Sequence, residues 1–323
     1  MNRFYLGRLA HEFGATWMRF WFSKANDRLA ARMRIAIGII CLLWLYSFST
    51  DVADWFGPKG VLRTQAIRNI ESSSLLDSPA SQWRFSLLDY CTTNSQVATF
   101  HLVAFGLAAA FTIGFATPFT SIATLVAVSS FVQRAPILFG AAEHLLLSAI
   151  LYLCIAPCGK HLSLDALLSR RGKTADDLTP TASESRSVRS NIALRLIQIH
   201  LAIVLLYSGL TKLSGVVWWN GDAVWWMLVQ PESALVDFSR LGADLYGELI
   251  MNAWTYAIVG TELIAATLIW FRLVRPLIIT ACVIVYLSLI PLTGLVGYCS
   301  IMIVLLFSFL HHSDSGDPKL CTA

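Results

Sequence analysis

One apolar segment of this 323-residue chain carries side chains that could move protons. His200, Ser208 and Lys212 are spaced by multiples of four residues, and Tyr207 lies beside them. At that spacing they share one face of a helix, so an imidazole, a hydroxyl and an amine form a single polar stripe. An amine in apolar surroundings is costly unless it is paired or neutral, and a neutral amine can accept a proton. Lys212 is therefore the first candidate for a general base.

Two interpretations of Lys212 stay open. As an anchor, it would snorkel to the membrane interface beside Trp218 and Trp219, which would then belong to an aromatic belt. As a base, it would be kept neutral by burial in an apolar cavity on the extracytoplasmic side, and the tryptophans would line a lipidic ligand pocket. An enclosed cavity shared with a second polar group favours the base, whereas an amine that reaches bulk water favours the anchor.

Two further carboxylates are predicted at membrane depth. Glu262 lies near the middle of a later apolar segment, where a carboxylate should be protonated, paired or facing water. Its natural partner would be Lys212 or His200. Glu143 and His144 follow Phe-Gly-Ala-Ala at the mouth of another segment, where they could transfer protons or bond to neighbouring helices.

The composition excludes an ordinary soluble domain. Hydrophobic residues make up 56% of the chain and charged residues 14%, and the mean hydropathy is +0.63, against about 25% charged residues in soluble domains. We therefore expect an all-α, polytopic membrane helical bundle whose first partner is the lipid bilayer. The net charge of +4 gives no reason to expect a nucleic-acid partner, because the basic residues cluster beside apolar segments.

Eight membrane spans are predicted, each requiring about 20 apolar residues. They cover 35–50, two spans within 90–133 divided around Pro118, 143–157, 192–211, 250–271, and two within 276–310 divided around 291–294. If the chain crosses the membrane at each of these spans, successive connections lie on alternate sides, and 17 of the 24 basic residues fall on one side. The positive-inside rule then places both termini in the cytoplasm of a cell-membrane protein.

The predicted spans also set the domain organisation. A basic cytoplasmic tail covers 1–34, a transmembrane domain covers 35–312, and a second cytoplasmic tail covers 313–323. The polar cytoplasmic linker 159–190 divides the transmembrane domain into two halves of four spans each. The seven cysteines form no disulfide framework, and their spacing predicts no metal site.

Several segments resemble the HTTM family, the membrane domain shared by vitamin K-dependent gamma-carboxylases and bacterial relatives. The resemblance covers nearly the whole chain. Its segments are RFWF at 19–22, DVADWFGPKGVL at 51–62, APCGKHLSLDALL at 156–168, YSGLTKLSGVVWWNGDAV at 207–224 and TELIAATLIWFRLVRP at 261–276.

The resemblance implies a chemistry as well as a fold. It places the family's proposed catalytic lysine on Lys212 and its acidic residue on Glu262, and it implies a reduced, vitamin K-like quinone as cofactor. In the carboxylases, oxygen converts the deprotonated hydroquinone to an epoxide while a strong base forms, and carbon dioxide adds to a deprotonated glutamate. We expect Lys212, Glu262, His200 and Glu143 to be catalytic or proton-relay residues. The predicted quinone contacts are Tyr207, Trp218 and Trp219.

The sequence also departs from the family pattern. Relatives commonly carry Asn-Gly-Gly-Asp where this chain has Gly-Ala-Ala-Glu at 140–143, so Glu143 corresponds only as a carboxylate. The large lumenal domain with which animal carboxylases engage a protein substrate has no counterpart in this sequence. The substrate therefore stays open between a peptide and a small molecule. The alternative is a non-enzymatic membrane protein: a lipid or peptide binder, an export factor or a transporter.

Overall fold

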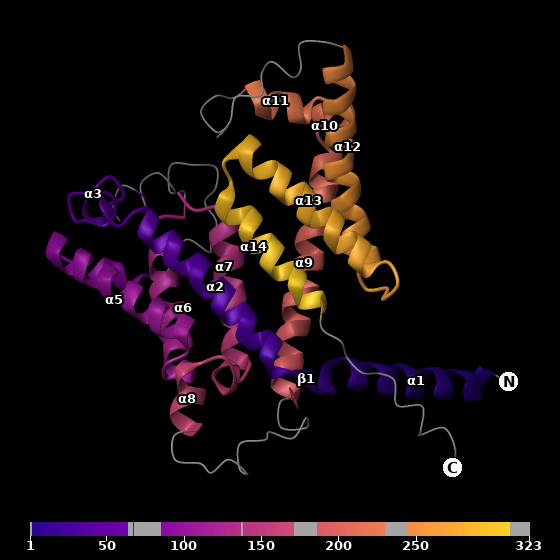
Figure 1. Ribbon diagram of the computed structural model, residues 1–323, viewed down its shortest axis with the longest axis horizontal. Helices are drawn as coiled ribbons and strands as arrows, with labels where there is room; N and C mark the ends of the chain where they lie inside the picture. Colours follow the sequence, from indigo (N-terminus) through magenta and orange to yellow (C-terminus); the bar gives the residue numbers. More distant parts are fainter. Residues whose placement is uncertain are drawn as a thin grey trace. The chain divides into compact units, whose positions relative to one another are not determined.

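The described residues of the chain form an almost entirely helical structure (Figure 1). The computed structural model describes residues 2–63, 67, 85–136, 138–170, 186–229 and 245–310. Within these residues, the only strands are the short antiparallel pair β1 (Ala25–Asn26) and β2 (Arg186–Ser187). The predicted all-α fold is thus confirmed for this part of the chain, whereas the predicted C-terminal tail 313–323 lies outside it.

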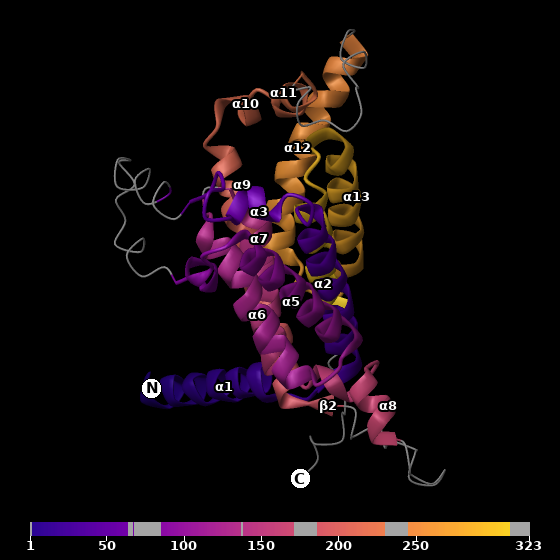
Figure 2. The ribbon, with the colours of Figure 1, turned by 90° about the vertical axis from the view of Figure 1, so that its left-hand side faces the viewer.

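The described residues divide into two compact units, one reaching Arg195 and the other spanning Leu196–Leu310. In the first unit, α2 packs against α5 and α7, and α6 packs between α5 and α7 (Figure 2). Its elements are α1 (Asn2–Phe22), α2 (Asp27–Ser47), α3 (Val52–Phe56), the 3₁₀ helix η2 (Leu87–Tyr90), α5 (Asn94–Ile113), α6 (Thr117–Arg134), α7 (Ala141–Ile155), the 3₁₀ helix η3 (Cys158–Lys160), α8 (Leu164–Arg170) and the start of α9 (Val188–Leu213).

An aromatic cluster holds the helices of the first unit together at one end. Phe131 of α6 is fully buried, and its ring centroid lies 5.4 Å from that of Phe48, after α2, and 5.2 Å from that of Phe56 in α3. His101 of α5 lies 5.9 Å from the same ring. Buried aromatic side chains remove large apolar areas from water, and this cluster joins four elements in one contact.

At the other end of α2, a buried arginine ties the helix to the segment after α7. The Arg34 side chain is fully buried, and its Nη1 and Nη2 atoms donate hydrogen bonds to the Cys158 and Leu162 carbonyls at 3.1 Å and 2.5 Å. Gly114 ends α5 with a φ of +74°, and a Cβ there would lie 2.1 Å from Arg34 Nη1. Arg34 is paired inside the protein and does not end the helix, so α2 begins at Asp27, before the predicted span 35–50.

Asp165 of α8 caps the start of α6. Its carboxylate accepts hydrogen bonds from the Ala116 amide at 2.7 Å and from the Thr117 amide and hydroxyl at 2.8 Å each. Burial raises the pKa of Asp165, but these hydrogen bonds together outweigh burial and hold the pKa below its ordinary value. The predicted linker 159–190 therefore begins with ordered structure, while its middle part, 171–185, lies outside the described residues.

The second unit contains the candidate site. It continues α9 and adds α10 (Val216–Trp219), α11 (Ala223–Val229), α12 (Leu245–Leu268), α13 (Arg275–Thr293), α14 (Val296–Leu306) and the 3₁₀ helix η6 (Phe307–Leu310). Helices α12 and α13 pack together, as do α13 and α14, and the latter pair turns at Gly294, which has a φ of +65°. A buried apolar cluster that includes Val224, Ile258 and Val285 joins α11, α12 and α13.

The helices indicate a multi-pass membrane protein. Five are long and apolar enough to cross a membrane: Asp27–Ser47, Asn94–Ile113, Val188–Leu213, Tyr246–Leu268 and Arg275–Thr293. Each of the eight predicted spans overlaps a helix, but Ala141–Ile155 and Val296–Leu310 are shorter apolar segments. A 15-residue helix reaches about 22 Å, less than the roughly 30 Å of a bilayer core. The count of eight spans stays a prediction.

We expect the two connections Phe48–Arg63 and Ile269–Val274 to lie on opposite sides of the membrane. Val61 and Leu273 are 70% and 91% exposed in these connections, so each is a suitable cysteine-labelling position. An impermeant thiol reagent should label Val61→Cys in intact cells and Leu273→Cys only after permeabilisation. The control is the same background without the introduced cysteine. Labelling of both positions from the same side would overturn the predicted alternation.

Candidate functional site

Lys212 and Glu262 form a partly buried ion pair between α9 and α12. Lys212 Nζ lies 2.8 Å from Glu262 Oε1, 2.7 Å from Oε2 and 2.5 Å from Ser208 Oγ. The Lys212 side chain is 20% exposed and that of Glu262 is 4% exposed. An ammonium has three hydrogens to donate, and three acceptor oxygens surround this one. The predicted pairing of Glu262 with Lys212 is therefore present, with Ser208 as a third member.

Trp218, in the short helix α10 that follows α9, lies over the same amine. Lys212 Nζ lies 5.4 Å from the centroid of the Trp218 ring, within the range of a cation–π contact. Trp218 also packs against the apolar cluster of α11, α12 and α13. The lysine is thus held at the last turn of α9, where a cation interacts favourably with the helix carbonyl end.

Gly209 allows α9 and α12 to approach closely enough for this pair to form. A Cβ at Gly209 would lie 2.6 Å from Leu263 Cδ2 and 2.8 Å from Leu263 Cγ. It would also lie 3.7 Å from the Cβ of Glu262. Gly209 immediately follows Ser208 and precedes Lys212 by three residues, so the absence of a side chain there brings the polar groups of both helices together.

Two tyrosines extend the site beyond the residues predicted from sequence. Tyr298 of α14 lies close enough to Ser208 and Glu262 to interact with both. Tyr286 lies edge-on to Tyr298, with ring centroids 6.3 Å apart, and its buried hydroxyl has no hydrogen-bond partner among the described residues. The sequence signal that could have identified both residues is a tyrosine within the uncharged apolar segment 276–310.

His200 is separated from Lys212 along α9, and Glu143 has contacts of its own within the first unit. His200 is half-buried and precedes Lys212 by 12 residues on α9, which is about 18 Å along the helix axis. Glu143 belongs to the first unit, where it accepts from Trp44 Nε1 at 3.2 Å and from the Gly140 amide at 2.9 Å. These contacts cap the start of α7 and join it to α2.

The three predicted quinone contacts have different surroundings. Trp218 lies against Lys212, as described above. Tyr207 is 71% exposed and Trp219 is 62% exposed. The Trp219 ring nitrogen donates to the Leu213 carbonyl, and its own carbonyl accepts from the Tyr256 hydroxyl at 2.7 Å. Of the three, Trp218 is the one in contact with the ion pair.

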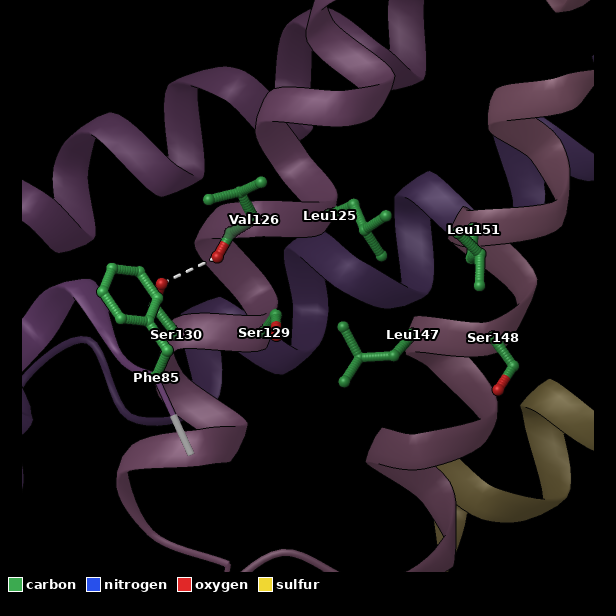
Figure 3. A pocket seen from close by; sticks show the side chains of 8 residues that line it. All are labelled: Phe85, Leu125, Val126, Ser129, Ser130, Leu147, Ser148 and Leu151. Atoms are coloured by element: carbon green, nitrogen blue, oxygen red, sulfur yellow. Dashed lines mark hydrogen bonds between the residues drawn. The ribbon is translucent and has the colours of Figure 1, made fainter. Parts of the chain in front are cut away.

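A cavity of about 450 Å³ is found elsewhere, on the α6 and α7 surface of the first unit (Figure 3). Leu125 and Val126 of α6 face Leu147 and Leu151 of α7 across it, and the remaining lining residues are Phe85, Ser129, Ser130 and Ser148. The Ser130 hydroxyl donates to the Val126 carbonyl at 2.7 Å. No residue of the Lys212 site lines this cavity.

The chemistry open to the Lys212 site is proton exchange. An ammonium next to a carboxylate can exchange a proton to give an amine and a carboxylic acid, and apolar surroundings reduce the cost of that neutral form relative to the charged one. In the neutral form, Lys212 can accept a proton from a bound molecule. In the charged form, the pair cross-links α9 to α12.

Comparisons with protein-family models, with curated proteins and with solved structures find no match to this chain. The class that the fold itself indicates is a multi-pass helical membrane protein, because five of the described helices are long and apolar enough to cross a membrane. The resemblance to the HTTM family stays a prediction from the segments quoted above.

Substitution of Gly209 should separate the two helices at the site. In Gly209→Ala, the new methyl group meets Leu263, and the overpacking should cost about 1–3 kcal/mol of stability. Gly260→Ala on α12 is the matched control, because a Cβ there meets nothing within 4 Å. Apparent melting temperatures in detergent should fall for Gly209→Ala and stay unchanged or rise for Gly260→Ala. Equal effects at the two positions would contradict the close helix approach.

A double-mutant cycle tests the ion pair itself. Lys212→Met and Glu262→Gln each leave a buried partner unpaired, at a cost of roughly 3–5 kcal/mol for a fully buried pair. The double variant removes both charges and should melt at a higher temperature than the two single effects predict. Lys59→Met, which removes an exposed lysine, serves as the control. Additive losses would show that the two side chains do not interact in the folded protein.

Proposed function

We propose that this membrane protein is an enzyme in which Lys212 and Glu262 form a proton-transfer site, with Lys212 as the base. The supporting observation is the contact of both Glu262 oxygens and Ser208 with the single amine of Lys212. A carboxylate this close can take the proton of the ammonium, which leaves the lysine able to accept another.

The proton balance of the proposed step is simple. In the resting pair, Lys212 carries the extra proton and Glu262 is ionised. Transfer of one proton from Nζ to Glu262 gives an amine and a carboxylic acid. The amine then takes a proton from a hydroxyl of the substrate, and the substrate becomes an anion. The pair holds one proton more than before and releases it to return to the resting state.

The proposed substrate of this step is a reduced quinone. A hydroquinone combines an apolar ring with acidic hydroxyls, which suits an amine in a membrane protein beside an aromatic side chain. Trp218 supplies that side chain at Lys212. The resemblance to the HTTM family supports the same substrate and extends the proposal to oxygen-dependent epoxidation, with carboxylation of a peptide or small molecule as its possible outcome.

A second candidate function is non-enzymatic, with the ion pair as a structural link. It is favoured by the same observation that three acceptor oxygens already surround the Lys212 ammonium. In that case, the protein binds lipid or peptide, assists export or transports a small molecule. The site then needs the charge of Lys212 and not its ability to lose a proton.

An epoxidation assay with Lys212→Arg separates the two functions. Purified protein in lipid nanodiscs would receive reduced menaquinone or phylloquinone, oxygen and labelled carbon dioxide, and epoxide and fixed label would be measured separately. Epoxide formation should fall at least 100-fold in Lys212→Arg, because a guanidinium stays protonated where an amine can lose its proton. Lys59→Arg is the matched control for a conservative change at an exposed lysine.

The melting temperature of each variant decides how the assay is interpreted. A folded Lys212→Arg protein without epoxidase activity supports the base. A folded Lys212→Arg protein with the activity of the original chain contradicts the base and favours the structural link. Absence of epoxide from the folded original protein with both quinones contradicts the proposed quinone chemistry.

A further inference from the structure

Helix α1 (Asn2–Phe22) has two chemically different sides. The predicted cytoplasmic tail 1–34 contains α1, which runs crosswise to α2 from the point where α2 begins (Figures 1 and 2). Glu12 and Arg19 are seven residues apart and share one side of this helix. Phe13, Trp17 and Phe20 follow one another at spacings of four and three on a different side, roughly 120° around the helix.

The apolar side of α1 is a continuous aromatic row. The Phe13 and Trp17 rings stack with centroids 6.2 Å apart, and Trp17 meets Trp21 edge-on at 5.8 Å. Phe13 and Trp17 are nevertheless 68% and 53% exposed. An aromatic row with this exposure is typical of a helix that lies in a membrane interface, where rings sit at the level of the lipid headgroups.

The end of α1 is fixed at the start of the spans. The Asn191 side-chain amide donates to the Phe20 and Trp21 carbonyls at 2.9 Å and 2.8 Å. Arg195 of α9 lies 4.3 Å from the centroid of the Phe20 ring. Since α2 is long and apolar enough to cross a membrane from Asp27 onward, a helix held crosswise at that end lies at the membrane surface.

Basic side chains surround the junction between α1 and α2. Arg19, Lys24, Arg28 and Arg32 are all exposed. Arg28 and Arg32 are four residues apart and therefore share one side of the first turns of α2. Exposed lysines and arginines near a membrane surface attract anionic lipids.

We infer that α1 is an interfacial helix that binds anionic phospholipid headgroups, with Phe13 and Trp17 inserted into the leaflet and the basic junction against the phosphates. The inference requires that α2 crosses the membrane, but it is independent of the proton-transfer proposal. The chemistry of the partner is thus a surface of lipid phosphates, on the side of the membrane that carries the N-terminus.

Spin labels on the two sides of α1 test the insertion. Single cysteines would replace Phe13, Trp17, Glu12 and Ala15 in the full-length protein, in a background whose native cysteines take up no label. The protein would be placed one copy per nanodisc in phosphatidylcholine containing about 30% phosphatidylglycerol. Labels at Phe13 and Trp17 should be accessible to oxygen and shielded from a water-soluble nickel reagent, and labels at Glu12 and Ala15 should show the reverse.

Charge removal tests the headgroup contact. Arg19→Gln combined with Lys24→Gln should reduce the oxygen-to-nickel accessibility ratio at Phe13 severalfold in the anionic nanodiscs and leave it unchanged in pure phosphatidylcholine. The control removes two exposed basic residues elsewhere, with Lys59→Gln and Arg63→Gln. Equal nickel accessibility at all four labels, or shielding of Phe13 and Trp17 from both reagents, would contradict insertion. An identical ratio in both lipid compositions would contradict anionic headgroup binding.

Discussion

An unpaired charge is too costly to keep in an apolar interior, and in the second unit Lys212 and Glu262 remove this cost by pairing with each other. Lys212 and Glu262 come from helices that are distant in sequence, and either charge without the other would destabilise the folded protein. Gly209 allows the helices to approach, and Ser208 accepts the remaining ammonium hydrogen. The same contacts that make the pair stable also place an exchangeable proton between two helices.

The first unit meets the same constraint in a different way. Arg34 is fully buried but pairs with backbone carbonyls of the segment after α7, and Asp165 pairs with amides at the start of α6. Asp165 satisfies amides that the start of α6 leaves open, and Arg34 satisfies carbonyls in the irregular segment between α7 and α8. Charge in this unit therefore fixes the connections between helices, and none of these contacts leaves a proton that a substrate could take.

The two units thus place their ionisable groups in environments with different consequences. A guanidinium bonded to carbonyls stays charged, so Arg34 is suited to a permanent link. An amine bonded to a carboxylate has a neutral alternative, so the Lys212 site can change its protonation state. The exposed basic residues near α1 form a third environment, in which the partner is a lipid surface outside the protein.

The sequence by itself determined the helical class, the approximate positions of the apolar helices and the two residues of the ion pair, because hydrophobic length and isolated charges are local signals. Local signals misplaced the start of α2, since Arg34 resembles a span boundary until its partners at Cys158 and Leu162 are known. Tyr298, Gly209 and the crosswise direction of α1 depended on which helices touch, and only the tertiary structure decides that.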